Sequence, residues 1–230
     1  SGKSLGTFFK EEIADPLHLD FWIGLPEEKE GLVAPMIPAK PDPARPLFQE
    51  LVKPGTIQAL TMGNNGGYMG PPPMFDSREA HAAEIGGAGG ITNARGLAGM
   101  YEPLALGGTK ENVELVNKET LHRMGLVASA TGRDAVLFTP TRFSLGFMKA
   151  MDNRREPEGL RDSVLISEDA FGHVGAGGSF GFADPKCSMS FGYTMNRMGP
   201  GLLLNERGQS LVDAVYRTLG YTSNRSGAWA

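Results

Sequence analysis

Residues 171–184 read Phe171-Gly-His-Val-Gly-Ala-Gly-Gly-Ser-Phe-Gly-Phe-Ala-Asp184 and lead into Pro185-Lys186. Asp-Pro-Lys is a composition typical of a tight turn. Beyond it, across residues 188–195, methionine, phenylalanine and tyrosine alternate with serine, glycine and threonine, which is the period of two of a half-buried strand. Strands joined by a tight turn are antiparallel. The stretch therefore predicts a β-hairpin whose strands are Gly178–Ala183 and Ser188–Met195.

The same stretch contains five glycines and, near its start, a single imidazole, His173. Glycine is favoured where another group approaches the main chain closely or where φ is positive. Backbone N–H groups exposed in this way can hold a negatively charged oxygen. We therefore expect the start of the hairpin to be a sheet edge that faces a substrate. A structurally hydrogen-bonded histidine beside a glycine-rich hairpin would explain the same residues, because glycine patterns have little specificity.

Helical patterns lie on both sides of the hairpin. Residues 4–14 have apolar side chains at helical spacing, and Asp15-Pro16 ends that helix because the residue before proline avoids the α region. A second helix is capped by Thr92 or Asn93 and runs to about Leu106, and a third begins at Asn117. A final helix, Glu206–Leu219, is predicted to turn Leu211, Val212, Val215 and Leu219 inward.

The order of these patterns predicts an α+β fold. Helices and loops come first, with a short strand at Phe21–Leu25 and a proline-rich connection at Ala34–Pro54. After about residue 130 the period becomes two, as in the alternation of Phe143, Leu145 and Phe147. We expect a helix- and loop-rich region at 1–130 and an antiparallel sheet with a C-terminal helix at 131–230, together part of one catalytic domain.

Composition limits the classes of function. The 230 residues are 40% hydrophobic and 21% charged, with a net charge of −4, so nothing favours nucleic acid or an anionic membrane as a partner. No apolar run reaches the roughly 20 residues that span a bilayer. The single cysteine, Cys187, cannot form an internal disulfide. His18, His81 and His122 have no second ligand at metal-binding spacing, so we expect no metal. His81 near Glu79 and Glu84 is interpreted as part of a solvated helix end.

His173-Val174-Gly175 resembles the third motif of the serine β-lactamase-like hydrolases, the family of class C β-lactamases, DD-peptidases and related esterases. That motif is usually Lys-Thr-Gly, or His-x-Gly in many esterase-like members. The resemblance extends to the segments Ser1–Pro26, His81–Gly108, Arg142–Gly146 and Tyr193–Gly199, and so covers nearly the whole chain.

Two motifs of that family are absent from these residues. No Ser-x-x-Lys occurs, and no Tyr-x-Asn occurs, since Tyr193 and Tyr221 have asparagine three positions on. In the family both motifs precede the segment that Ser1–Phe9 resembles. The chain thus looks like the C-terminal part of such a hydrolase, with a β-lactamase/transpeptidase-like fold that is incomplete at the N-terminus. The resemblance implies that this chain alone is inactive.

The resemblance also implies a site. His173 would donate a hydrogen bond or a positive charge to the substrate, the N–H of Ala176 would form one arm of an oxyanion hole, and Gly175 would let the substrate approach. Gly177 and Gly178 would contact the substrate, and Tyr68 would do so if its glycine-rich loop walls the pocket; that loop could equally be a surface excursion. The reaction would pass through an acyl-serine on a small ester or amide, without cofactor or metal. The His-x-Gly form favours an esterase or an amide-cleaving relative over an efficient β-lactamase.

Two other interpretations remain. The chain could be a non-catalytic interaction or structural module derived from this fold, whose unpaired sheet edges would associate with the missing N-terminal segment or with another chain. Gly2-Lys3-Ser4 could end a phosphate-binding loop, with Val164–Asp169 as a partner strand. A capped helix start is the simpler interpretation of Gly2-Lys3-Ser4, because the sheet pattern is antiparallel.

Overall fold

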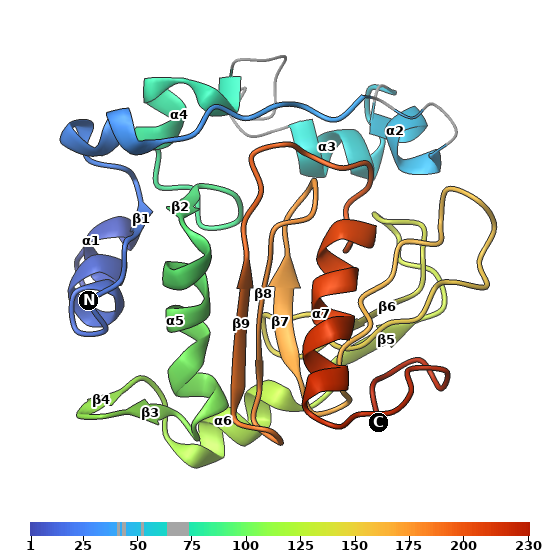
Figure 1. Cartoon of the computed structure of the whole chain (residues 1–230). Coiled ribbons are helices and arrows are strands. Elements are labelled where there is room, and N and C mark those ends of the chain that lie inside the picture. The colour runs from blue at the N-terminus through green and yellow to red at the C-terminus, as the bar shows by residue number, and fades with distance from the viewer. Residues whose placement is uncertain (41, 43–44, 52, 64–73) are drawn as a thin grey trace.

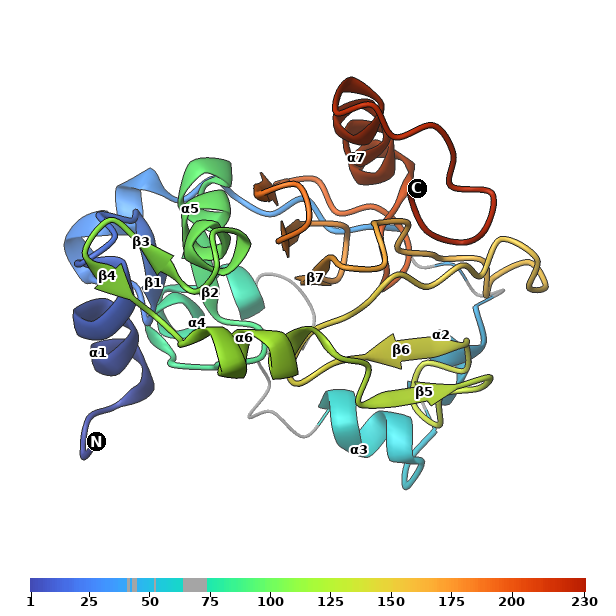
Figure 2. The same ribbon diagram turned by 90° about the horizontal axis from the view of Figure 1, so that it is seen from below.

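The computed structural model describes residues 1–40, 42, 45–51, 53–63 and 74–230. At its centre lie three antiparallel strands, β7 (Phe171–Val174), β8 (Phe180–Asp184) and β9 (Met189–Tyr193). Helix α7 (Glu206–Thr218) covers one face of these strands and helix α5 (Ala94–Ala105) covers the other (Figure 1). Figure 2 shows from below that the two helices lie on opposite sides of the strands. The hairpin predicted from residues 178–195 is confirmed, with Asp184 paired to Met189 across its turn.

The sheet continues beyond β7. Strand β5 (Ser129–Thr131) pairs with β6 (Thr141–Phe143), and Met148 forms antiparallel bridges to both Phe143 and Gly172. The predicted alternation through Phe147 is therefore only partly right. The chain turns back after Phe143 through a hydrogen bond from the N–H of Ser144 to the carbonyl of Phe147, and this turn leaves Leu145 exposed.

The side chains explain why each helix packs where it does. On the α7 side, Phe182 stacks against Tyr216, which stacks in turn against Trp229, and all three are buried. On the α5 side, Gly181 and Gly192 have no side chain, and a Cβ at either position would overlap atoms of α5. Strands β8 and β9 therefore alternate large residues toward α7 with small residues toward α5, which brings α5 into direct contact with the backbone of the sheet.

The remaining helices and strands surround this core. They are α1 (Leu5–Phe9) with a π-helical turn at Lys10–Ala14, β1 (Phe21–Ile23), a 3₁₀ segment at Glu27–Leu32, α2 (Pro46–Leu51), α3 (Ile57–Gly63), a 3₁₀ turn at Met74–Asp76, α4 (Arg78–Ala82), β2 (Gly90–Thr92), β3 (Thr109–Lys110), β4 (Val113–Glu114) and α6 (Lys118–Gly125). Strand β1 pairs with β2 and β3 pairs with β4, both antiparallel. Among the described residues, none of the helices has the length and apolar character that crossing a bilayer needs.

The helix starts follow the capping residues expected from the sequence. Asn93 caps α5 and Asn117 caps α6, each through a side-chain oxygen that accepts a backbone N–H of the first turn. The predicted inward face of α7 is wrong in two positions. Leu211 and Leu219 are exposed, because the buried stripe follows Gly208, Val212 and Tyr216 at intervals of four residues.

Two buried tyrosines predict the alkaline stability of the fold. Burial raises the pKa of Tyr101, and burial next to Asp184 raises the pKa of Tyr216. Above pH ~10 the two tyrosines ionise in the unfolded chain but stay neutral in the folded chain. The free energy of unfolding therefore keeps its full value below pH ~10 and falls as the pH rises further. Ionisation of each tyrosine in the unfolded chain is expected to lower the free energy of unfolding by about 1.4 kcal/mol at pH 11.

Thermal unfolding followed by circular dichroism between pH 8 and pH 11 would measure this loss. A Tyr101→Phe variant is expected to show a shallower decline above pH 10 than the unsubstituted chain. An unfolding midpoint that stays constant to pH 11 would contradict the prediction.

Candidate active site

The motif predicted from the sequence lies at the end of β7. Side chains along this strand alternate, so Phe171 and His173 face the α5 side of the sheet while Val174 packs in the core beneath α7. His173 is the exposed residue of the strand, and its ring lies 6.5 Å from the ring of Phe143 on the neighbouring β6. The imidazole thus stands at the surface of the sheet, with one aromatic ring, that of Phe143, near it.

The hydrogen bond of His173 restricts the chemistry of its ring. Nδ1 lies 2.8 Å from the carbonyl oxygen of Val174. A carbonyl oxygen only accepts, so Nδ1 carries the proton, and Nε2 of the neutral ring is then an acceptor. Nε2 can donate to a substrate oxygen only when the ring is protonated. The predicted donor role of His173 therefore requires the imidazolium form.

The residues after β7 form a tight turn that leaves one N–H free. The N–H of Gly178 donates to the carbonyl of Gly175 at 2.9 Å, and the third residue of the turn, Gly177, has φ of 89°. A positive φ at this position requires glycine, as in a type II turn. The N–H of Ala176, the second residue, meets no acceptor in the part of the chain that the structure describes, and Ala176 is half-buried.

Gly177 and Gly178 are the buried residues of this turn. The carbonyl of Gly177 accepts the N–H of Gly199 at 2.8 Å, and its N–H lies 3.3 Å from the carbonyl of Gly201. A Cβ at Gly177 would overlap the side chains of Met195 and Met198. Both glycines thus have a clear role in packing the turn, and a direct contact with substrate stays a prediction for them. Tyr68, the other predicted substrate contact, lies outside the described residues.

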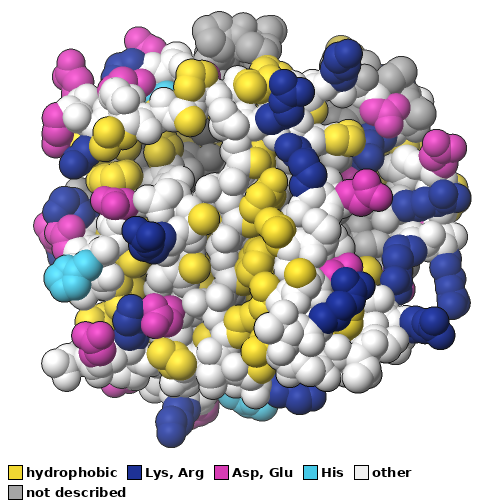
Figure 3. Space-filling model, viewed as in Figure 1, with side chains coloured by type: hydrophobic (Ala, Val, Ile, Leu, Met, Phe, Trp, Pro, Cys, Tyr) yellow, Lys and Arg dark blue, Asp and Glu magenta, His cyan; other side chains and the backbone are white. Residues whose placement is uncertain are grey.

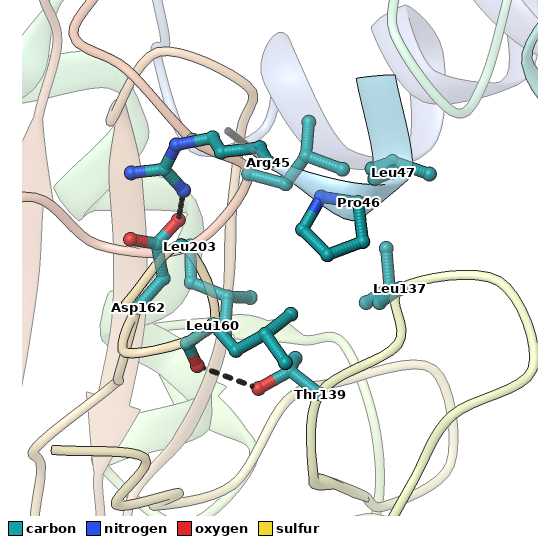
Figure 4. Close-up of a pocket in the computed structure, with 11 residues that line it drawn as sticks. Arg45, Pro46, Leu47, Leu137, Thr139, Leu160, Asp162 and Leu203 are labelled. Atoms are coloured by element: carbon teal, nitrogen blue, oxygen red, sulfur yellow. Dashed lines mark hydrogen bonds and ion pairs between the residues drawn. The ribbon is translucent and has the colours of Figure 1, made fainter. Parts of the chain in front are cut away.

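Near the turn lies a small pocket, shown in Figure 4. Leu47, Leu160 and Leu203 line it, and Arg45 reaches across to Asp162 at 2.5 Å, against Gly201. Its volume is about 30 Å³, whereas pockets for small molecules enclose roughly 300–1,000 Å³. This pocket is therefore a packing gap between α2 and the sheet region, and it does not compete with the motif as a substrate site.

A larger hollow of about 350 Å³ lies over β5 and β6. Its charged groups are already paired within the protein, Arg142 with Glu168 at 3.0 Å and Asp152 with Arg154 at 2.7 Å. The hollow therefore offers no free charge that would select a ligand.

The other candidate residues have structural roles. Burial raises the pKa of the Cys187 thiol to about 11, so this thiol stays protonated near neutral pH and is a poor nucleophile. Ser4 caps α1 by accepting the N–H of Thr7, which supports the capped helix start at Gly2-Lys3-Ser4. Val164–Asp169 forms no strand of its own, contrary to what a phosphate-binding fold would need.

His81 is a correction to the sequence analysis. It is buried, and Nδ1 lies 2.8 Å from Glu30 while Nε2 lies 3.6 Å from Asp76. The contact with His81, and then that with Arg78, holds the pKa of Glu30 below its usual range. His81 thus joins three segments of the N-terminal half, and it is not part of a solvated helix end. Within the described ranges, no three histidine, cysteine or acidic side chains are grouped as metal ligands.

Comparison with known proteins identifies the family. The family model described as Beta-lactamase matches residues 1–215, so the chain belongs to the beta-lactamase family. The chain is 27% identical over 223 residues to Esterase/beta-lactamase LipL of Mycobacterium tuberculosis (strain ATCC 25618 / H37Rv), over 90% of this chain and 46% of that protein.

Two solved structures agree with this assignment. A family VIII carboxylesterase is 32% identical with a TM-score of 0.73, over 94% of this chain and 52% of that one. EstA from Arthrobacter nitroguajacolicus Rue61a is 28% identical with a TM-score of 0.76, over 96% and 55%. These comparisons confirm the predicted resemblance to the β-lactamase-like serine hydrolases and the α+β fold class. The chain spans about half the length of the relatives it matches.

Proposed function

We propose that this chain is the C-terminal half of a serine acyl hydrolase that cleaves small esters or amides through an acyl-enzyme. The attacking serine, with the lysine and tyrosine that activate it, would lie on residues outside these 230. Membership of the β-lactamase family supports the reaction class. The observation that carries the site is the N–H of half-buried Ala176, just after β7, which meets no acceptor among the described residues.

In this proposal the serine Oγ attacks the substrate carbonyl, and negative charge develops on the carbonyl oxygen. The N–H of Ala176 and the N–H of the serine itself would donate to that oxygen, and one such donor supplies about 3–4 kcal/mol of transition-state stabilisation. His173 as imidazolium would add a further donor or a positive charge, and Gly175 leaves room for the substrate. When the carbonyl re-forms, the C–O or C–N bond of the substrate breaks and the alcohol or amine leaves with the proton taken from the serine. Water then hydrolyses the acyl-serine to the free acid and restores the serine hydroxyl, so the cycle needs no cofactor.

The edge of the sheet favours the alternative, a non-catalytic interaction module. In the described part of the chain nothing pairs with the outer edge of β9, whose residues are half-buried. Figure 3 shows apolar side chains gathered in a band between α5 and α7. An unpaired strand edge is a template for another segment or chain, and such a module would use it to bind its partner.

Labelling with a serine-directed fluorophosphonate distinguishes the two functions. The 230-residue chain is expected to remain unlabelled, because its described and undescribed residues together contain no Ser-x-x-Lys. The protein translated from the complete reading frame is expected to be labelled at one serine, located by mass spectrometry, and to hydrolyse p-nitrophenyl esters.

A heat-denatured sample of each protein controls for non-specific reaction. Stoichiometric labelling of a serine within the 230 residues would show that the nucleophile has been misplaced. Absence of both labelling and ester hydrolysis in the complete protein would favour the non-catalytic module.

A further inference from the structure

One amide side chain connects the start of α7 to the motif turn. The Oδ1 of Asn205 caps the helix by accepting the N–H groups of Arg207 at 3.2 Å and Gly208 at 3.4 Å. Its Nδ2 points the other way and donates to the carbonyl of Gly177 at 2.8 Å. The same side chain thus satisfies a helix terminus and a carbonyl of the turn that presents the Ala176 N–H.

Glycines make this contact possible on two sides. A Cβ at Gly178 or at Gly199 would overlap the amide of Asn205. The carbonyl of Gly177 accepts both this amide and the N–H of Gly199, so both of its lone pairs are used. The peptide group between Gly177 and Gly178 is therefore held by two donors from the connection between β9 and α7, which restricts the orientation of the turn.

We infer that Asn205 is a positioning residue for the Ala176 N–H. The inference rests on the proposed function for its catalytic consequence, although the contacts stand without it. Positioning matters because an oxyanion donor stabilises the transition state only when it is already aimed at the developing charge. Asparagine carries its acceptor and its donor on two separate atoms, so it can cap the helix and donate to the turn at the same time, whereas serine and threonine have both functions on one hydroxyl oxygen.

Asn205→Asp separates the two roles of this side chain. Aspartate caps a helix about as well as asparagine. Its carboxylate cannot donate, and it would place a second acceptor against the carbonyl of Gly177. The matched control is Asn117→Asp on α6. Asn117 is exposed and caps its helix through Oδ1, 2.8 Å from the N–H of Thr120, and its Nδ2 meets no acceptor in the described part of the chain.

Hydrogen exchange on the 230-residue chain tests the positioning directly. In Asn205→Asp the N–H of Gly199 is expected to exchange about tenfold faster than in the unsubstituted chain. A change of this size follows from the loss of one hydrogen bond between neutral groups in the turn. In Asn117→Asp the same N–H should exchange at the unsubstituted rate. Equal exchange in both variants would overturn the inference, whatever the chain catalyses.

Kinetics of the complete protein test the consequence. Asn205→Asp is expected to lower kcat about tenfold or more while KM changes less than about twofold, since an interaction made only in the transition state is lost. A residue that merely caps α7 would leave kcat unchanged. If the complete protein hydrolyses no ester, the proposed function fails, and the exchange experiment still decides the positioning. If it hydrolyses esters and the Asn205→Asp variant keeps full kcat, the inference fails alone.

Discussion

Ala176→Pro in the complete hydrolase is expected to lower kcat by about two to three orders of magnitude while the fold is kept. Proline has no backbone N–H, so the substitution deletes the proposed oxyanion donor and no other polar group. Removal of one oxyanion donor costs about 10²–10³ in kcat in other acyl hydrolases. No side-chain substitution elsewhere in the motif removes this donor so directly.

The turn is suited to the substitution. Ala176 is the second of the four residues Gly175–Gly178, and proline is favoured there because its fixed φ matches the turn. The residue before a proline is restricted to extended conformations, and glycine at 175 follows directly on a strand. The deleted N–H meets no acceptor among the described residues, so folding loses no hydrogen bond there.

The measurement compares kcat, KM and the thermal unfolding midpoint of Ala176→Pro with those of Ala176→Gly. The glycine variant keeps the N–H and is expected to retain most of the activity. A proline variant that unfolds at the same temperature as the unsubstituted protein and keeps its kcat would exclude the Ala176 N–H from the reaction.

The fold was predictable where its signals are local. The hairpin of β8 and β9 follows from a period of two and a turn composition, and the starts of α5 and α6 follow from asparagine caps. The pairing of β1 with β2 joins Phe21 to Thr92, and a strand of three residues that begins at Gly90 has no periodicity to detect. Such short pairs form because the tertiary structure brings them together, which sequence patterns do not record.

The candidate site likewise has some residues that a local motif predicts and others that come together only in the folded chain. His173, Gly175 and Ala176 lie within four consecutive residues, so one motif was enough to select them. Asn205 was missed, although an asparagine directly before a helix that starts with Glu206 was a capping signal. Its second bond, to a carbonyl 28 residues earlier, exists only in the folded chain.

Asp184 was predicted as a turn residue. Its position in the fold predicts that its substitution lowers the stability much more than the loss of a turn residue would. It is fully buried, and its Oδ2 accepts the hydroxyls of Ser167 at 2.6 Å and Tyr216 at 2.8 Å. Its Oδ1 accepts the N–H of Lys186 at 3.1 Å. The carboxylate therefore connects the end of β8, the loop before β7 and helix α7 at the base of the core.

Asp184→Ala is expected to lower the free energy of unfolding by about 3–5 kcal/mol, because it leaves two buried hydroxyls without their acceptor. Asp169→Ala is the control. Asp169 is exposed and lies 3.8 Å from exposed Lys186, so its loss should change stability by less than about 1 kcal/mol. Urea unfolding of the 230-residue chain measures both variants.

The same loss should be smaller in a background that lacks the two donors. In Ser167→Ala/Tyr216→Phe, the substitution Asp184→Ala no longer leaves hydroxyls unpaired, so it is expected to cost about 1–3 kcal/mol less than in the unsubstituted chain. That difference is the coupling energy of the network, and it separates hydrogen bonding from the loss of a turn residue. Equal costs in the two backgrounds would mean that Asp184 acts through the turn alone, and that α7 is held on the sheet by the stacked rings of Phe182, Tyr216 and Trp229 without help from the carboxylate.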